Sequence, residues 1–434
     1  MSFRQRWQEI REGFERAFWV ANITEVFERI GYYGVNAVLA IYLHENLKFS
    51  ETEAGDIIGY FGGVVWFLPI VGGTLADRYG FRRSLAAAYL ILAAGYFLLG
   101  SLGAEWMAPL REALPLSTLV LILLTIPALG PAIVKPCVVG TTARASSETV
   151  RSVGYSIYYT LVNVGGMLGP LMAFFVRESI GVENVFRVCA LSVLLMFFGV
   201  VLFYQEPKRS GEQPVASLGT AFRNMALVLT NGKFMTFLLI FSGFYVVFWQ
   251  EFIALPLYVS GYVDANAKIE LLLTIDPLCI ILFQIAVSYV TRKIAPFSAM
   301  TLGLLVASCS WLLLTVGDPT WSVKGIPVWP AIALVVLSLG EMILSPRLYE
   351  YVSRLAPAGQ QGVFMGYAFL PVAIGFVIAG AMGGRLVEYF GKELGQPQQL
   401  WWVVSGWGLA STALMWVYDR VNRPGGEESR NQKS

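Results

Sequence analysis

Apolar residues fill long stretches of this chain, and polar residues gather in the short segments between them. An α-helix of about 20 residues crosses the roughly 30 Å hydrocarbon core of a bilayer, so each long apolar stretch is a candidate span. We delimit twelve such stretches at 19–43, 54–76, 84–103, 116–140, 153–176, 185–205, 234–260, 269–291, 297–316, 328–352, 361–386 and 399–418. The alternating ten-residue pattern of barrel strands does not occur. The pattern therefore predicts an all-α integral membrane protein with twelve transmembrane helices.

The longest connector expected on the inner side divides the apolar stretches into two sets of six. It covers 206–233 and contains the polar sequence "EPKRSGEQPVASLG", which is typical of a linker. We therefore expect two six-helix bundles, at 19–205 and 234–418. Residues 1–18 are charged and amphipathic, and we expect them along the cytoplasmic membrane surface. Residues 419–434 have the composition of a disordered tail.

The distribution of lysine and arginine predicts the orientation in the membrane. With the N-terminus inside, the inner connectors carry twelve basic residues and the outer connectors six. The inner set is Arg78, Arg82, Arg83, Arg144, Arg151, Lys208, Arg209, Arg223, Lys233, Arg292, Lys293 and Arg354, and the outer set is Lys48, Arg111, Arg177, Lys268, Lys324 and Lys392. The positive-inside rule then places both termini in the cytoplasm of a multi-pass cell (inner) membrane protein.

Composition agrees with a membrane location and argues against several functions. The 434 residues are 56% hydrophobic and 14% charged, whereas a soluble domain is usually about 25% charged. The four cysteines lie in apolar stretches without metal-site spacing, so we expect them to be buried and unpaired. The single histidine, His44, argues against a haem or multi-histidine metal centre. We expect no metal and no cofactor, and the chain lacks the phosphate loop of an ATP-driven pump.

Charged residues interrupt the first apolar stretch, at "ITEVFERIGYYG". Glu25, Glu28 and Arg29 share one helix face, and the spacing of Glu25 and Arg29 suits a helical ion pair. Tyr32 and Asn36 continue the polar stripe. A lone charge at mid-membrane costs roughly 2.5–3.5 kcal/mol on insertion scales, so the stripe should face a protein interior or a hydrated cavity. Two carboxylates sharing one arginine leave a surplus that can bind a proton or a cation. The alternative is a structural latch between two helices.

Four further spans contain polar residues that are candidates for the same cavity. Lys135 lies in the fourth span, Asn163 in the fifth, Asp276 in the eighth and Glu341 in the tenth. Glu251 in the seventh span is a weaker candidate because that span is less sharply bounded. Lys135 could instead extend to the inner surface, and Asn163 could be a plain interhelical hydrogen-bonding residue.

Aromatic and small residues accompany these polar positions. Tyr33 and Trp66, with Tyr32, could line a binding pocket, although aromatic side chains in spans more often serve packing. Gly165 and Gly169 in the fifth span are four residues apart, which is typical of close helix–helix packing.

The connector "GGTLADRYGFRRS", at 72–84, resembles the loop after the second span in the major facilitator superfamily. Gly73, Asp77, Arg78 and Gly80 match its pattern, as do two further arginines. We expect a tight turn in which Asp77 accepts hydrogen bonds from a neighbouring helix end or a basic side chain. The alternative is a solvated basic turn that only enforces topology.

A second resemblance is to the proton-dependent oligopeptide transporters, the POT family, which is a branch of the same superfamily. "EVFERIGYYG" is similar to the family signature E-x-x-E-R-F-x-Y-Y-G, and "VKPCV", "YYTLVNVGGMLGP" and "GEMILSPRLYEYVSRLAP" resemble later family segments in the same order. The resemblance implies the major facilitator fold. It also implies that Glu25, Glu28 and Arg29 couple protons, that Lys135 lies near a substrate carboxylate, and that Asn163 and Glu341 lie near a substrate amino group.

Three positions depart from the pattern of the peptide carriers. These usually have arginine at the place of Asn36, asparagine at the place of Asp276 and tyrosine at the place of Trp66. Losing a cation and gaining an anion makes the pocket more negative. We therefore expect a substrate with a positive or neutral head, such as an amine, an amino-acid derivative or a cationic drug.

The sequence thus predicts a proton-coupled symporter of a small organic solute. An antiporter that exports a drug or metabolite would use the same residues, and a transporter-like receptor without flux is a further alternative. A multi-span enzyme is not expected, because no nucleophile, acid–base pair or metal cluster lies near one membrane interface. Expected partners are a small-molecule substrate, protons and the lipid bilayer, with no nucleic acid, and we expect a monomer.

Overall fold

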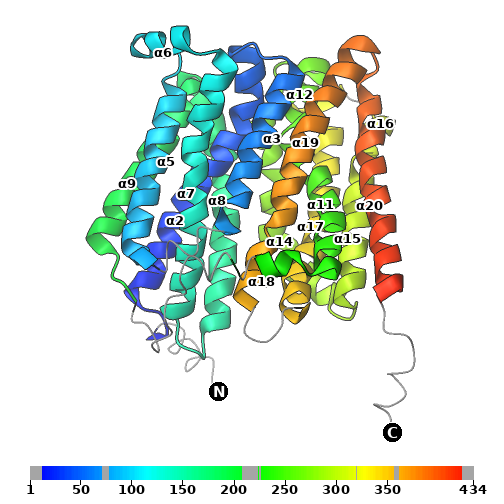
Figure 1. Ribbon diagram of the computed structural model, residues 1–434. Helices are drawn as coiled ribbons and strands as arrows, with labels where there is room; N and C mark the ends of the chain where they lie inside the picture. The colour runs from blue at the N-terminus through cyan, green and yellow to red at the C-terminus, as the bar shows by residue number, and fades with distance from the viewer. Residues whose placement is uncertain are drawn as a thin grey trace.

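The computed structural model describes residues 12–70, 78–207, 223, 226–318, 320–355 and 361–422. Within these ranges the chain is almost entirely helical (Figure 1). The exception is a hairpin of β1 (Ser322–Val323) and β2 (Ile326–Pro327), in which Ser322 pairs with Pro327 and Val323 with Ile326. Lys324 and Gly325 connect the strands with φ of 53° and 82°, as a tight hairpin turn requires.

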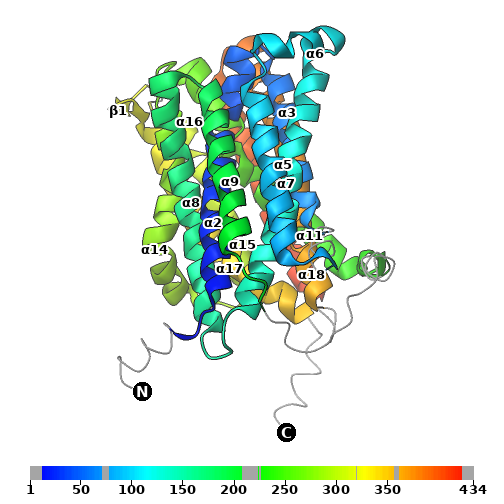
Figure 2. The same cartoon turned by 90° about the vertical axis from the view of Figure 1, so that its left-hand side faces the viewer.

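The helices form two bundles that follow each other in the sequence (Figures 1 and 2). The first contains α2 (Arg16–Ile41), α3 (Glu51–Phe67), α5 (Phe81–Gly100), α7 (Leu116–Arg144), α8 (Arg151–Ile180) and α9 (Glu183–Phe203), with the short η1 (Tyr42–Asn46), η2 (Glu105–Met107) and α6 (Ala108–Ala113). The second contains α11 (Gly232–Phe248), η3 (Trp249–Glu251), α12 (Ala254–Tyr258), η4 (Val259–Val263), α13 (Ile269–Leu273), α14 (Ile275–Thr291), α15 (Pro296–Ser310), α16 (Leu313–Val316), α17 (Val328–Leu355), α18 (Gln361–Tyr367), α19 (Leu370–Glu388), η5 (Tyr389–Glu393), η6 (Pro397–Gln399) and α20 (Leu400–Asn422).

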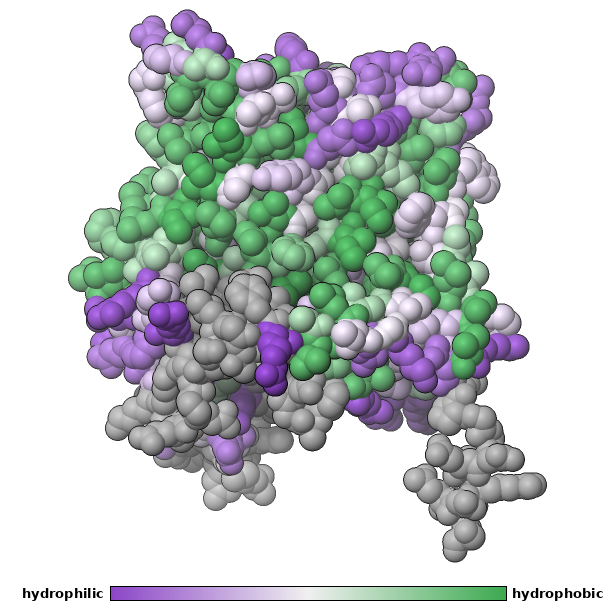
Figure 3. Space-filling model, viewed as in Figure 1, coloured by the Kyte–Doolittle hydropathy of each residue, from purple (hydrophilic) through white to green (hydrophobic). Residues whose placement is uncertain are grey.

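The twelve-helix prediction and the two six-helix bundles are confirmed. Ten helical stretches of the described residues are long and apolar enough to cross a membrane. The other two spans are α2, which carries the buried charges, and α3, whose described part has 17 residues. Apolar side chains cover the middle of the surface, and polar ones gather towards both ends (Figure 3). We call the end where α2 begins and α20 ends the inner end, following the predicted orientation, and the opposite end the outer end.

Small residues allow α2 and α8 to pack closely beside the buried charges. A side chain at Gly165 would meet the Cβ of Arg29 at 2.5 Å and the carbonyl oxygen of Val26 at 2.9 Å. One at Gly169 would meet the backbone nitrogen of Gly34 at 2.8 Å. The predicted close-packing role of Gly165 and Gly169 is therefore confirmed. It brings the backbone of α8 directly onto the stem of Arg29.

Three spans of the second bundle are broken along their length. The seventh span changes from α11 to the 3₁₀ turn η3 at Trp249, and then continues as α12. The eighth is interrupted at Thr274, just before Asp276 and Pro277. The eleventh is interrupted between α18 and α19, just before Pro371. Proline lacks the backbone N–H that a continuous helix needs, which explains the last two breaks. Broken membrane helices are typical of transporter binding sites.

The bundles contact each other mainly through α3 with α19 and through α8 with α13 and α14. Between α3 and α19 the contact is a seam of glycines on both sides. A side chain at Gly59 would lie 3.1 Å from the Cα of Gly380, and one at Gly55 would lie 3.0 Å from the Cα of Gly384. The seam runs from the outer end of α3 inwards, because residue 55 lies in the first turns of that helix.

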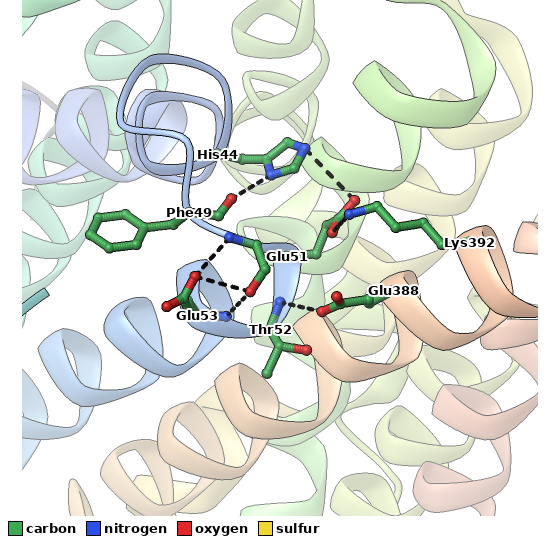
Figure 4. Close-up of polar contacts among 8 residues, drawn as sticks. His44, Phe49, Glu51, Thr52, Glu53, Glu388 and Lys392 are labelled. Atoms are coloured by element: carbon green, nitrogen blue, oxygen red, sulfur yellow. Dashed lines mark hydrogen bonds and ion pairs between the residues drawn. The ribbon is translucent and has the colours of Figure 1, made fainter.

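Polar contacts also join the bundles at the outer end (Figure 4). Glu51 forms an ion pair with Lys392, and the carboxylate of Glu388 accepts from the backbone N–H of Thr52 at 3.2 Å. His44 lies with Nε2 3.7 Å from Glu51. The outer end of the molecule is therefore closed by charge as well as by packing.

Two further ion pairs cross the same interface. Arg385 of α19 donates to both carboxylate oxygens of Asp56 of α3, at 2.6 and 2.9 Å. Arg177 of α8 pairs with Glu270 of α13, whose side chain is fully buried. Because these pairs lie near the ends of their helices that we call outer, the structure represents a state closed at that end, and we refer to it as the outwardly closed state.

Candidate functional site

The predicted charged cluster on α2 lies inside the protein, not against lipid. The side chains of Glu25, Glu28 and Arg29 are all at most 2% exposed. The Nε of Arg29 donates to Oε2 of Glu28 at 2.5 Å, so the arginine pairs with its neighbour in sequence. The helical pairing of Arg29 with Glu25, four residues earlier, does not form as an ion pair within 4 Å among the described residues.

Glu25 has a different environment from Glu28. Its Oε1 accepts from the hydroxyl of Tyr158 on α8 at 3.3 Å, and its Oε2 has no hydrogen-bond partner among the described residues. Oε1 of Glu28 is also without such a partner. The site thus contains two buried carboxyl groups, one arginine and two unused oxygen atoms. Each unused oxygen is a place where a proton can be held.

A line of contacts leads from this cluster to the interface between the bundles. The guanidinium carbon of Arg29 lies 5.1 Å from the ring centre of Tyr32. The hydroxyl of Tyr32 accepts from the indole Nε1 of Trp66 at 3.1 Å. The ammonium of Lys135 lies over the Trp66 ring, 4.2 Å from its centre. Tyr32, Trp66 and Lys135 therefore form a continuous line of contacts with the charged cluster, and their role in binding stays a prediction.

Aromatic rings from both bundles meet at this depth. Trp66 lies 6.1 Å from Trp249 and 5.9 Å from Phe369, and Tyr33 lies 6.2 Å from Phe252, measured between ring centres. Trp249 is in the 3₁₀ break of the seventh span, Phe252 follows it, and Phe369 is in the break of the eleventh span. The broken helices thus present aromatic side chains to the first bundle.

The second bundle contributes three carboxyl groups. Glu251, Asp276 and Glu341 lie within electrostatic range of one another. Asp276 accepts from the hydroxyl of Ser338 at 2.6 Å, whereas Oε2 of Glu251 and of Glu341 have no hydrogen-bond partner among the described residues. No ion pair joins any of the three to a basic side chain in the described ranges. We call these three carboxyl groups the acidic cluster.

Two predicted polar residues make only local hydrogen bonds. The amide of Asn36 donates to the carbonyl of Tyr32 at 2.8 Å, and that of Asn163 donates to the carbonyl of Tyr159 at 2.9 Å. Both partners lie one turn back on the same helix. Asn163 is partly exposed and Asn36 is buried, with its Oδ1 unpartnered among the described residues. A ligand role for either residue stays a prediction.

The predicted loop motif is only partly described. Gly73 and Asp77 lie outside the described residues. Gly80 adopts φ of 82° at the start of α5, and Arg78 stacks on the neighbouring Tyr79. The start of α5 is capped by Glu206, whose carboxylate accepts from the backbone N–H groups of residues 81 and 82 at 2.8 and 3.0 Å. A carboxylate at a helix N-terminus is favourable, and the sequence did not indicate this partner because it follows α9.

The cysteine prediction is partly wrong. Cys137, Cys189 and Cys279 are buried and form no disulfide, but Cys309 on α15 is exposed. Lipid is as apolar as a protein core, so an apolar segment does not reveal which of its faces is buried. Among the described residues no group of histidine, cysteine, aspartate and glutamate side chains could hold a metal ion.

Comparison with known proteins identifies the family. The sequence model of the Major Facilitator Superfamily matches residues 22–370. The chain is 23% identical to dipeptide and tripeptide permease A of Erwinia pyrifoliae, over 86% of each chain. It is also 26% identical to the uncharacterized MFS-type transporter YttB of Bacillus subtilis, covering 81% of this chain and 83% of that protein.

Solved structures show the same fold. A POT family transporter in complex with a thioalcohol-conjugated peptide matches with a TM-score of 0.76 at 20% identity, over 94% of this chain and 97% of that one. Another, in complex with 5-aminolevulinic acid, matches with a TM-score of 0.74 at 19% identity over the same shares. The protein belongs to the Major Facilitator Superfamily of membrane transporters, and its resemblance to the POT branch is confirmed.

Sequence reasoning missed several residues of this centre or gave them too little weight. Phe252 and Phe369 were not singled out, and Glu251 was a weak candidate. The available signals were the adjacent polar pair Gln250–Glu251 inside an apolar span and the proline two residues after Phe369. Both mark helix breaks, and side chains at breaks face the site.

Proposed function

We propose that the protein is a proton-coupled symporter of a small organic solute, with Glu25, Glu28 and Arg29 as its proton-coupling group. The observation that carries this proposal is the buried Glu28–Arg29 ion pair beside Glu25, whose carboxyl group forms no ion pair among the described residues. Breaking a buried ion pair by removing one partner costs about 3–5 kcal/mol. One proton crossing 100 mV supplies about 2.3 kcal/mol, and a pH gradient adds to this. Proton arrival therefore supplies energy of the same order as the pairing it disturbs.

The contacts from Arg29 through Tyr32 and Trp66 to Phe369 transmit the effect of protonation to the interface between the bundles. Neutralising Glu28 removes the partner of Arg29, whose guanidinium then depends on Glu25 and the Tyr32 ring. Tyr32 holds Trp66 by a hydrogen bond, and Trp66 contacts the second bundle through Phe369. A change in pairing on α2 thus alters side chains that touch the opposite bundle. The bundles then exchange the outwardly closed state for an outwardly open one, as in alternating access.

We further propose that the solute carries a positive or neutral head group and depends little on a carboxylate. Among the described residues, the centre contains five carboxyl groups, two in the first bundle and three in the second, and two cations, Arg29 and Lys135. The surplus carboxyls can be neutralised only by protons or by a positively charged ligand. Relatives are named for dipeptides and tripeptides, and one similar structure holds 5-aminolevulinic acid. Amines and amino-acid derivatives of that size fit this charge balance.

Flux through Glu28→Gln in proteoliposomes tests the coupling. We expect proton-driven accumulation to be abolished and solute counterflow exchange to persist, because glutamine keeps the shape but cannot titrate. Glu105→Gln is the matched control, since Glu105 is exposed near the outer end. Loss of both activities in folded Glu28→Gln protein would show a structural role. Unchanged accumulation would refute the assignment.

The solute class is tested with a dipeptide and its blocked derivatives. We expect amidation of the C-terminal carboxylate to change uptake by less than threefold, and acetylation of the amino group to lower uptake more than amidation does. The reverse pattern would contradict the proposed charge preference.

A specific observation also favours an antiporter as the second candidate. Protons and a cationic solute neutralise the same acidic cluster of Glu251, Asp276 and Glu341, so they compete for it. Competition of this kind exchanges one cation for the other. Proteoliposomes with a pH gradient of either sign distinguish the two: a symporter accumulates solute when the outside is acidic, and an antiporter accumulates it when the inside is acidic.

A further inference from the structure

We propose that Trp66 and Phe369 form a cation-binding seat between the bundles, which Lys135 fills in this state and which a ligand ammonium group occupies by displacing it. The inference deepens the proposed function, and rests on it for the location of the solute. The ligand class is a small amine or quaternary ammonium compound with an apolar body.

The geometry of the seat is that of a cation beside two adjacent rings. The Nζ of Lys135 lies 4.2 Å from the centre of the Trp66 ring and 5.5 Å from that of Phe369. The two ring centres are 5.9 Å apart and their planes differ by 31°. A cation within about 6 Å of a ring centre is attracted by the ring's quadrupole, and tryptophan is the strongest such partner. Both rings are therefore within range of the same ammonium.

Contacts with Tyr32 and Trp249 hold the Trp66 ring in this orientation. Its Nε1 donates to the hydroxyl of Tyr32 at 3.1 Å, and Trp249 lies 6.1 Å from it. Trp66 is only 8% exposed. The seat is thus preorganised, and a preorganised site loses little free energy in ordering its own groups when a ligand binds.

Lys135 uses the rings in place of a carboxylate. No ion pair joins it to an acidic side chain within 4 Å among the described residues, although Arg29 in the same centre has one. It nevertheless lies within electrostatic range of Glu25 and Glu28. A displaced Lys135 therefore has negatively charged groups to move towards. The two rings attract any ammonium group. The ammonium group of a ligand can therefore replace that of Lys135, and the seat still holds one positive charge.

The seat also joins the two bundles. Trp66 is on α3 and Lys135 on α7 of the first bundle, while Phe369 is in the break between α18 and α19 of the second. A cation held there contacts both halves. A ligand in the seat consequently takes over an interbundle contact that Lys135 makes in its absence.

A double-mutant cycle on purified protein tests the inference by equilibrium binding of benzyltrimethylammonium, without any flux measurement. Lys135→Met empties the seat, and we expect tighter binding by about 2–30-fold, which corresponds to the 0.5–2 kcal/mol range of cation–π contacts. Removing a positive charge would also raise affinity through general electrostatics. The cycle separates the two effects, because the gain should vanish in a Trp66→Leu background only if it depends on the ring.

Controls keep the test decisive. Trp66→Phe retains a ring and should retain most of the gain, and Trp416→Leu changes an exposed tryptophan on α20 and should have no effect. Melting temperatures establish that each variant is folded. A gain that persists without the Trp66 ring, no gain in Lys135→Met, or no binding to either form would overturn the seat. Proton coupling through Glu28 is measured separately by flux, so failure of one proposal is distinguishable from failure of the other.

Discussion

The glycine seam between α3 and α19 leads to a sharp prediction about the conformational equilibrium. An ideal Cβ added to Gly55 would lie 2.5 Å from the carbonyl oxygen of Gly380 and 3.0 Å from the backbone nitrogen of Gly384. Both are backbone atoms and cannot rotate away. Gly55→Ala therefore forces the two helices apart at the outer end, but only in the outwardly closed state, where they touch.

The expected size follows from the cost of overpacking. Inserting a methyl group into a closely packed contact costs about 1–3 kcal/mol. With RT of about 0.6 kcal/mol, this shifts the ratio of outwardly closed to outwardly open protein by roughly 5- to 150-fold towards the open state. Gly406→Ala is the matched control, because a Cβ at Gly406 on α20 would meet no atom within 4 Å.

Distances between spin labels at positions 45 and 393 report this equilibrium. Glu45 and Glu393 are exposed at the outer ends of opposite bundles, and Cys309 must be replaced first because it is exposed. We expect Gly55→Ala to enlarge the population with a long distance between the labels. We expect Gly406→Ala to leave that population as it is in the labelled protein with both glycines unchanged. An unchanged distribution in Gly55→Ala would refute the view that this seam is tightly closed only in the outwardly closed state.

Three further predictions concern single side chains. Arg177→Gln should destabilise the outwardly closed state by about 3–5 kcal/mol, because it leaves Glu270 buried without its partner. The spin labels at positions 45 and 393 measure this change, and a shift below about 1 kcal/mol would contradict the buried pairing. Glu251→Gln should raise the melting temperature, because it replaces a buried carboxyl group that has no basic partner among the described residues with an amide that cannot ionise, and a lower melting temperature would show that the carboxyl group is needed. A membrane-permeable maleimide should label Cys309 but not Cys137 in folded protein, and equal labelling would contradict their assigned burial.

The fold could be predicted from the sequence because hydrophobic length alone determines the spans. Twelve apolar stretches and one long polar connector were sufficient for two six-helix bundles. The charged stripe on the first span was equally informative, since the cost of a charge in lipid leaves few places for Glu25, Glu28 and Arg29 other than the protein interior. Gly165 and Gly169 also predicted a real contact, because close approach of helices needs small residues.

The partners of each side chain could not be predicted in the same way. Helical spacing favoured Glu25 as the partner of Arg29, but a long flexible side chain reaches the adjacent Glu28 equally well. The family resemblance implied a substrate carboxylate near Lys135, and it did not indicate that the ammonium of Lys135 would lie over an aromatic ring. Such choices depend on distances between helices, which a single sequence does not contain. Phe369 likewise gains importance only from a helix break that brings it beside the other bundle.

The central claim is that protonation of the buried cluster on α2 controls which end of the transporter is open. Label distances between the outer ends, recorded from pH 5 to pH 8 in the protein and in Glu28→Gln, test it most directly. We predict that the population of outwardly closed protein changes with pH and that this change is lost in Glu28→Gln. An equal pH response in both proteins would contradict the claim, because the titrating group would then lie elsewhere.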